Sequence, residues 1–354
     1  MYTLRRRALF TNFTLGAVAS LLPVGHQAAS AAEQLTVVGA GGALQDAERK
    51  AFFQPFASET GVQLTEDSYS GQIARVRAMV QSRSVTWDVM QVEQNTLLQG
   101  GEEGLFENLD WSKIGDRQDF LPEAVSDYGV GAFVWSMVLT YDRAKLPTGP
   151  RSWSDFWDTT SFPGKRGLRA TAKMTLEIAL LADGVEPGQI YQVLRTPQGI
   201  ERAFAKLDHL KPNLLWWTSG AEPIERLASG DLAMSAAFNG RVTAANQGGR
   251  DFALLWDGQV YGIDYWAIVK GSPRRGAGER FIAFASRADT QSRFPEYIPY
   301  GVTNRKAAAR IDQRIADNLP TTPRNLAKAV ALNTEFWADN GEALETRFAS
   351  WRSR

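Results

Sequence analysis

The chain has 354 residues, of which 44% are hydrophobic and 22% charged, a composition typical of a soluble protein of about two domains. Its 39 basic and 39 acidic side chains balance, so no excess of positive charge points to a nucleic-acid partner. Because the chain has no cysteine, it can form no disulfide, thiolate metal site or cysteine nucleophile.

The N-terminus has the three parts of a secretory signal. Arginines at 5–7 precede an uncharged apolar run over 8–22, and small residues at 28–32 provide a cleavage site. The apolar run is too short to span a bilayer. We therefore expect residues 1–32 to be a signal peptide, exported by either the general secretory or the twin-arginine route.

Strands and helices alternate along the first hundred residues that follow. A buried strand at 35–38 leads into a helix that Gly61 ends, and a second strand follows at 62–65. A helix capped by Ser70 and a third strand at 87–92 come next. This alternation predicts a parallel sheet with crossover helices.

The α/β pattern then repeats in a second unit. A long apolar strand at 133–141 precedes a break at 146–150, and the alternation resumes as far as about residue 262. A strand at 265–269 and three further helical stretches complete the chain. We expect two α/β lobes whose connections cross more than once, without repeats or a long linker.

A glycine-rich turn joins the first strand to the first helix. Gly39 and Gly41 fit the start of a dinucleotide-binding G-x-G-x-x-G pattern, but Leu44 occupies the third glycine position. We prefer a site in which the backbone N–H groups of Gly41 and Gly42 bind a polar group of a small ligand. A tight turn without a ligand, or a nucleotide cofactor in an exported oxidoreductase, are the alternatives.

A second candidate segment runs from 215 to 223. Pro223 suits the first turn of a helix, so Ser219 and the N–H groups after it would point out of that helix start, beside Trp217. An aromatic wall beside free donors is a common way to orient a polar ligand. The alternative is that Trp217 belongs to the core.

Two charged residues follow separate strands of the second unit. Arg241 comes after a strand that starts near residue 232, and Asp264 ends the segment 261–264. Both would face the crevice at the carboxyl ends of the strands. The guanidinium offers a bidentate fork for a carboxylate, and Asp264 could pair with an ammonium group. Alternatively, the two residues pair with each other or lie on the surface.

Signatures of catalysis and of metal binding are missing from the sequence. It has no P-loop, nucleophile elbow or paired metal-binding histidines, and after the signal peptide only His209 remains, beside the apolar stripe of a helix. The sequence therefore offers little catalytic equipment and no recognisable metal or cofactor site.

The order of several short motifs resembles the periplasmic solute-binding proteins of ATP-binding-cassette (ABC) importers, in the spermidine/putrescine-binding family. These motifs are F-F-x-P-F at 52–56, E-T-G-V at 59–62, W-S-D-F-W at 153–157, F-N-G-R at 238–241, D-Y-W-A-I at 264–268 and Y-G-V-T-N at 300–304.

This resemblance implies a two-lobed (type II) periplasmic-binding-protein fold of the α/β class, with a hinge and a ligand cleft between the lobes. We expect lobe 1 to comprise 33–138 and 266–302, and lobe 2 to comprise 139–265 and 303–354. The resemblance also implies a binding protein rather than an enzyme, and we expect no cofactor and no metal. It further implies a periplasmic location, delivery of the solute to a membrane permease, and a monomer.

Family residues match this chain unevenly. The resemblance implies that Asp264 grips an amine and that Phe238 and Tyr300 are aromatic cleft residues. A second acidic residue expected for a diamine is missing at 170–173, and Arg241 is added. The pattern resembles relatives that bind zwitterions such as γ-aminobutyrate.

A polyamine stays open if Glu93 or Glu177 supplies the second acid, and a ferric-ion carrier of the same fold is a further alternative. The expected ligand-binding residues are Gly41, Gly42, Glu93, Trp217, Ser219, Phe238, Arg241, Asp264 and Tyr300.

Overall fold

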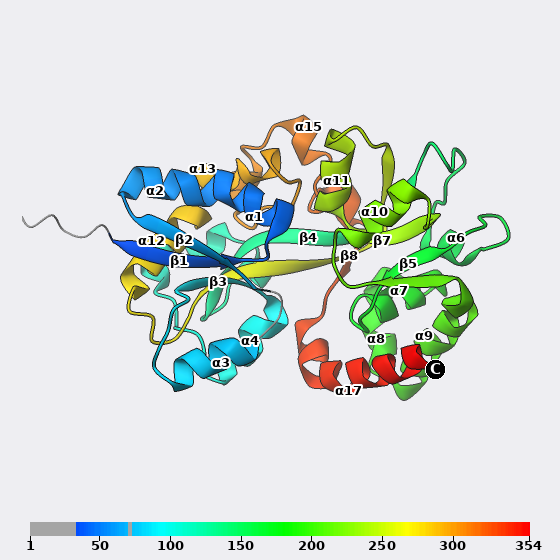
Figure 1. Ribbon diagram of the computed structural model, residues 1–354, viewed down its shortest axis with the longest axis horizontal. Coiled ribbons are helices and arrows are strands. Elements are labelled where there is room, and N and C mark those ends of the chain that lie inside the picture. The colour runs from blue at the N-terminus through cyan, green and yellow to red at the C-terminus, as the bar shows by residue number, and fades with distance from the viewer. Residues whose placement is uncertain (1–32, 70–72) are drawn as a thin grey trace, which may run out of the picture. The chain divides into compact units, whose positions relative to one another are not determined.

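The computed structural model describes residues 33–69 and 73–354 (Figure 1). The expected signal peptide, residues 1–32, and the expected helix cap Ser70 lie outside the described residues.

In the described part of the chain, nine strands form one mixed sheet. They are Gln34–Gly39 (β1), Gln63–Ser68 (β2), Val89–Glu93 (β3), Gly129–Asp142 (β4), Arg166–Arg169 (β5), Leu214–Trp217 (β6), Met234–Phe238 (β7), Phe252–Ile268 (β8) and Val330–Ala331 (β9). Their order is β2-β1-β3-β8-β4-β7-β5-β6, with β9 paired to β8. The expected parallel pairing holds for β1, β2 and β3 at one end and for β5, β6 and β7 at the other.

Two long antiparallel strands, β4 and β8, join the two ends of this sheet (Figure 1). The carboxyl-terminal part of β8 pairs with β3, whereas the carboxyl-terminal part of β4 pairs with β7. Sequence reasoning expected a strand end at Asp264 and a separate strand at 265–269. This was wrong, because β8 runs without a break through both, with Gly258 in its interior. Gly258 has φ 76, and its carbonyl accepts a 2.8 Å hydrogen bond from Trp153 Nε1. An interior glycine of this kind marks a close approach, not a break.

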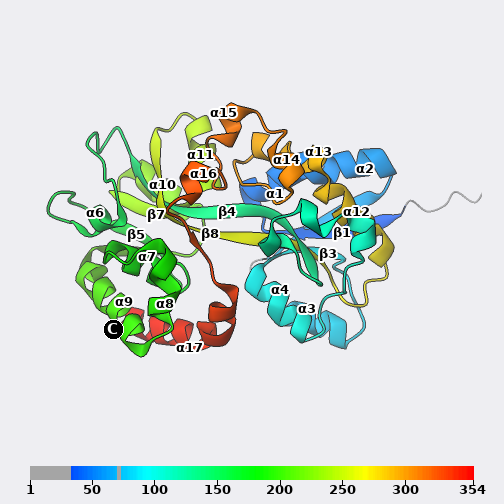
Figure 2. The ribbon, with the colours of Figure 1, turned by 180° about the vertical axis from the view of Figure 1, so that it is seen from behind.

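Helices cover both faces of each end of the sheet. Near β1, helices α1 and α2 lie on one face and α3 and α4 on the other; near β5, α17 runs beside α8 and α9 (Figures 1 and 2). None of the helices within 33–69 and 73–354 has the length and apolar character needed to cross a membrane. The α-helices are Gly42–Glu48 (α1), Gln54–Thr60 (α2), Ile73–Gln81 (α3), Gln94–Glu102 (α4), Trp111–Ile114 (α5), Trp153–Trp157 (α6), Thr175–Ala182 (α7), Ile190–Leu194 (α8), Pro197–Leu210 (α9), Glu222–Ser229 (α10), Asn239–Gln247 (α11), Arg275–Ser286 (α12), Ala288–Gln291 (α13), Arg305–Ala308 (α14), Gln313–Ala316 (α15), Pro323–Leu326 (α16) and Thr334–Ser353 (α17).

The first helical stretch departs from the expected continuous helix. A π-helical turn, Arg49–Phe53, separates α1 from α2, and Gly61 ends α2 in the left-handed conformation with φ 73. The wider turn keeps Phe52 and Phe53 buried against Trp266 of β8. π-helical turns inside α-helices are rare and are frequent at functional sites.

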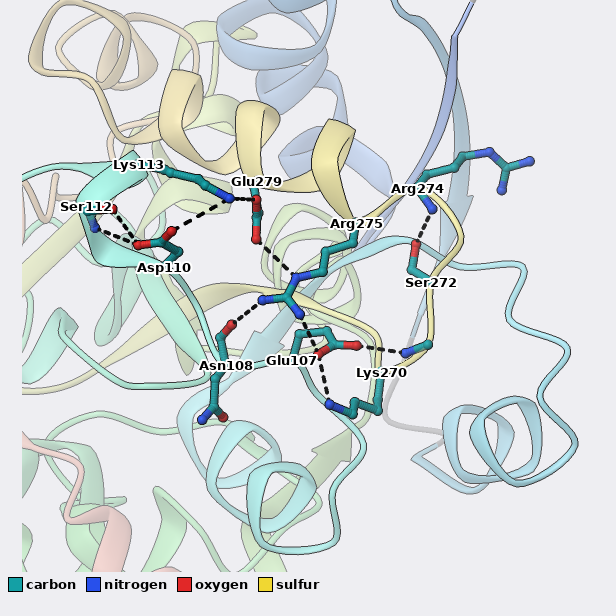
Figure 3. Close-up of polar contacts among 11 residues, drawn as sticks. Glu107, Asn108, Asp110, Ser112, Lys113, Lys270, Ser272, Arg274, Arg275 and Glu279 are labelled. Atoms are coloured by element: carbon teal, nitrogen blue, oxygen red, sulfur yellow. Dashed lines mark hydrogen bonds and ion pairs between the residues drawn. The ribbon is translucent and has the colours of Figure 1, made fainter.

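An ion-pair network fixes the point where the chain leaves β8 (Figure 3). Arg275, at the start of α12, lies between Glu279, 3.1 Å away, and Glu107, 3.2 Å away. Lys113 pairs with Glu279 at 2.6 Å, and Lys270 pairs with Glu107 at 2.9 Å. Both glutamates are buried, so the network anchors the segment after α4 against the end of β8 and the start of α12.

Candidate functional site

Asp264 lies in the interior of β8, not at a strand end as the sequence suggested. In the sheet it stands opposite Glu93 of β3 and Phe133 of β4. Its carboxylate accepts hydrogen bonds from Gln91 Nε2 and, at 2.6 Å, from Trp135 Nε1. Each carboxylate oxygen keeps a further lone pair, and the residue is 8% exposed. Burial and then the charge of Glu93 raise the pKa of Asp264 to about 6.

Arg241 lies in the first turn of α11, directly after β7. Within residues 33–69 and 73–354 its guanidinium forms no ion pair, so the alternative in which Arg241 pairs with Asp264 is wrong. Two glycines leave room for the side chain. A Cβ built on Gly220 would lie 2.7 Å from Arg241 Nε, and one built on Gly42 would lie 3.7 Å from its Nη1. The guanidinium therefore lies between the α1 turn and the loop after β6.

Aromatic side chains connect the arginine to the aspartate. Phe238, the last residue of β7, makes an edge contact with Trp135 at 5.5 Å and with Trp217 at 6.0 Å between ring centroids. Tyr300 stacks on Phe133 at 5.3 Å. Burial raises the pKa of Tyr300, the charge of Arg241 lowers it, and the charge of Asp264 raises it again. The phenol is therefore near both charges.

Glu93 is already paired in this structure. It forms an ion pair with Lys173, which also donates to Asn95 Oδ1 at 3.2 Å. The charge of Lys173 is the main reason that the pKa of Glu93 falls to about 2, with a further contribution from Arg169. Glu93, Trp135 and Lys173 line one pocket together with Leu332, which follows β9, and with Thr334 and Trp337 of α17.

Two of the expected backbone donors are occupied. Gly41 has φ 71 at the start of α1, and its N–H donates to Gln45 Oε1 at 3.0 Å. Ser219 is exposed, and its N–H donates to Glu222 Oε1 at 2.7 Å. The expected free N–H of Gly41 is therefore occupied. Two of the N–H groups that follow Ser219 are occupied as well, because that of Ala221 donates to Ser219 Oγ at 3.4 Å and that of Glu222 donates to the Ser219 carbonyl at 3.1 Å. In both places a side chain of the following helix caps the turn.

A profile of the family described as bacterial extracellular solute-binding proteins matches residues 51–321. The chain belongs to this family. A relative from Pseudomonas aeruginosa, named γ-aminobutyric acid-binding protein, is 49% identical over 337 residues, which cover 95% of this chain and 96% of the relative.

Solved structures of solute-binding proteins share the fold. A substrate-binding protein of an ABC transporter from Bradyrhizobium japonicum is 36% identical with a TM-score of 0.85, covering 90% of this chain and 99% of the other. A structure described as a GABA receptor is 33% identical with a TM-score of 0.81, covering 90% and 98%. The expected two-lobed periplasmic-binding-protein fold is confirmed.

Family membership also identifies this solute-binding protein as a binding protein rather than an enzyme, as expected. The exported oxidoreductase with a nucleotide cofactor is therefore overturned. In the part of the chain that the structure describes, no three His, Asp or Glu side chains are grouped closely enough to hold a metal ion.

Glu177, the other candidate for a second amine-binding acid, lies in the core of the half formed by α7, α8 and α17. One of its carboxylate oxygens accepts hydrogen bonds from Tyr191 Oη and Trp337 Nε1, both at 2.7 Å. Burial raises the pKa of Glu177. Glu93 is thus held by Lys173, and Glu177 is enclosed in this core, where its Oε1 accepts both hydrogen bonds and its Oε2 has no partner among the described residues.

Four residues near the site were missed by sequence reasoning. Gln91 and Trp135 donate to Asp264, and the guanidinium of Arg169 lies 5.7 Å from the ring centroid of Phe238. Glu48 of α1 is completely buried and close enough to Asp264 for their charges to interact. A signal for Glu48 was present, because it follows Leu44 by four residues and precedes Phe52 by four, so a charged residue interrupts an apolar helical stripe.

Proposed function

We propose that this protein is the periplasmic substrate-binding component of an ABC importer and that it captures a zwitterion of the γ-aminobutyrate type. In this proposal, Arg241 binds the carboxylate and Asp264 binds the ammonium group. The observation that carries it is an arginine with no ion-pair partner in the described part of the chain, joined to a buried aspartate by Tyr300 and an aromatic wall. Opposite charges at the two ends of one solute would satisfy both groups.

The charges around the cleft favour a zwitterion over a diamine. Arg169, Lys173 and Arg241 contribute three positive charges, whereas Glu93 and Asp264 contribute two negative charges when ionised. The difference, 3 − 2 = +1, opposes the entry of a dication and favours a solute that carries a carboxylate.

The relatives support the same solute class. The Pseudomonas aeruginosa relative is named for γ-aminobutyric acid, and one similar structure is described as a GABA receptor. Phe238, Trp217 and Tyr300 would cover the methylene groups between the two charged ends. Gly42 would contribute by leaving space for the guanidinium.

Closure would combine groups from both lobes. We propose lobe 1 as 33–138 with 266–302 and lobe 2 as 139–265 with 303–354, so that both long central strands cross the hinge. Glu93 and Lys173 then come from different lobes and their ion pair spans the cleft. A solute held by Arg241 and Asp264 of lobe 2 and covered by Tyr300 of lobe 1 would touch both lobes only in the closed state, which is why it would drive closure.

Export and delivery complete the proposal. Residues 1–32 would direct the chain to the periplasm, by the twin-arginine route if the pair Arg6-Arg7 is read as that signal. The closed monomer would then present its solute to a membrane permease.

A thermal-shift and calorimetry screen of the purified exported protein tests the proposed solute. γ-Aminobutyrate at 100 times its Kd should stabilise the protein by about 2.7 kcal/mol, because it binds only the native state. Butylamine and butyrate, each lacking one charged end, serve as matched controls and should bind far more weakly. Stabilisation by putrescine or spermidine without stabilisation by γ-aminobutyrate would contradict the proposal.

A further inference from the structure

Glu48 is a buried carboxyl group without a partner. The residue is 0% exposed, and neither Oε1 nor Oε2 has a hydrogen-bond partner among the described residues. Glu177 is equally buried but accepts two hydrogen bonds. Burying an unsatisfied carboxyl group is costly, so Glu48 calls for an explanation other than packing.

The fold provides a specific place for this carboxyl group. Glu48 ends α1 and immediately precedes the π-helical turn Arg49–Phe53. Its carboxyl oxygen lies against Gly39, where an added Cβ would be 2.8 Å from Oε2. Any other residue at Gly39 would displace the carboxyl group.

The charged groups around Glu48 are mainly acidic. Asp264 on β8 and Glu66 on β2 both act on it, and burial is the largest cause of a pKa raised well above its ordinary value. Glu66 is itself held by Arg49, at 2.7 Å, so that arginine is not available to Glu48. The charges of Glu48, Asp264 and Arg241 all shift the pKa of Tyr300. Glu48 therefore lies close enough to the proposed ligand-binding groups to interact with the same phenol.

We propose that Glu48 is the second carboxyl group of the ammonium site, and that it holds a proton in the free protein and releases it when a cationic amine binds at Asp264. The inference rests on the proposed function, because it takes the ammonium group to bind at Asp264. In the exchange, the O–H bond of Glu48 breaks, its proton passes to the buffer, and the carboxylate that remains is balanced by the incoming ammonium group. No electrons are transferred.

This arrangement explains how two acidic groups can share a buried site. The free protein carries one negative charge there instead of two, which avoids like-charge repulsion in a region from which water is largely excluded. The second charge forms only when a cation is present. The apparent affinity should therefore rise with pH over a wider range than Asp264 alone, with a pKa of about 6, would account for.

Calorimetry at pH 8 in two buffers with different protonation enthalpies counts the protons released. With γ-aminobutyrate, the wild-type protein should release measurably more protons per bound solute than Glu48→Gln, which should release almost none. Glu177→Gln is the matched control, because it removes an equally buried glutamate that has other partners, and it should behave as the wild type.

The outcomes separate this inference from the proposed function. Binding without proton release in the wild type, or unchanged release in Glu48→Gln, overturns the inference while the proposed function stands. Absence of binding overturns the proposed function. ¹³C NMR of the glutamate side-chain carboxyls then tests the inference without a solute. A carboxyl signal that titrates at clearly higher pH than those of the exposed glutamates, and that disappears in Glu48→Gln, supports it; a Glu48 that titrates with the exposed glutamates overturns it.

Discussion

Replacing Arg241 by methionine should abolish most of the affinity for γ-aminobutyrate while leaving the fold intact. The side chain forms no ion pair within residues 33–69 and 73–354, so its removal strands no buried partner. Two charge-assisted hydrogen bonds to a carboxylate are worth about 1.5–3 kcal/mol each, and Arg241 is partly exposed, so we take the lower value. A loss of about 3 kcal/mol corresponds to roughly a 100-fold increase in Kd.

Calorimetry with two solutes isolates this interaction. The variant should bind γ-aminobutyrate about 100-fold more weakly than the wild type. Butylamine, which has no carboxylate, should bind both proteins with similar affinity. Urea denaturation should show little change in the free energy of unfolding. A Kd for γ-aminobutyrate within about threefold of the wild type would refute the role of Arg241, and an equal loss for butylamine would show that the substitution damages the cleft generally.

Three further predictions concern the same cleft. Protonation of Asp264, whose pKa is about 6, competes with the ammonium group. Affinity should therefore fall at least about tenfold per pH unit below pH 6 in titration calorimetry, and more steeply if Glu48 also releases a proton; a flat profile down to pH 4 would contradict this. Lys173→Met should lower the free energy of unfolding at pH 7 by about 1 kcal/mol. Because pairing lowers the pKa of Glu93 to about 2, this stabilisation is present above pH 4.5 and is lost as the pH falls toward 2. In urea titrations the difference in unfolding free energy between the variant and the wild type should therefore shrink over that pH range. Gly220→Ala would place a Cβ 2.7 Å from Arg241 Nε and should weaken γ-aminobutyrate binding about tenfold with little change in Tm, whereas unchanged binding would show that the guanidinium has room to move.

Local patterns were sufficient for part of the fold. The alternation of apolar strands and amphipathic helices located β1, β2 and β3 within two or three residues, and Gly61 and Pro223 marked a helix end and a helix start as expected. These features depend on neighbouring residues alone. The extent of β8 and the π-helical turn could not be predicted, because tertiary packing of Trp153 on Gly258 and of Phe52 on Trp266 decides them.

The residues of the site likewise fall into those that the sequence predicts and those that only the tertiary structure brings together. Arg241 and Asp264 could be identified because each is a charged residue in an otherwise apolar or glycine-containing segment. Their partners could not, because Gln91 and Trp135 approach Asp264 only through the cross-strand register of β3 and β4 with β8. Capping of the two turns by Gln45 and Glu222 could not be predicted either, since the sequence does not show which donors a side chain will occupy.

The hydrogen bond from Trp135 to Asp264 also gives the protein an internal optical reporter. An indole whose N–H donates to a carboxylate experiences the electric field of that charge, and any cation that neutralises the carboxylate changes this field. Trp135 should therefore shift its emission when the amine end of a solute arrives, although ten other tryptophans contribute to the spectrum. A difference spectrum between the wild type and Trp135→Phe would isolate its contribution, so occupancy could be followed in real time without attaching a dye.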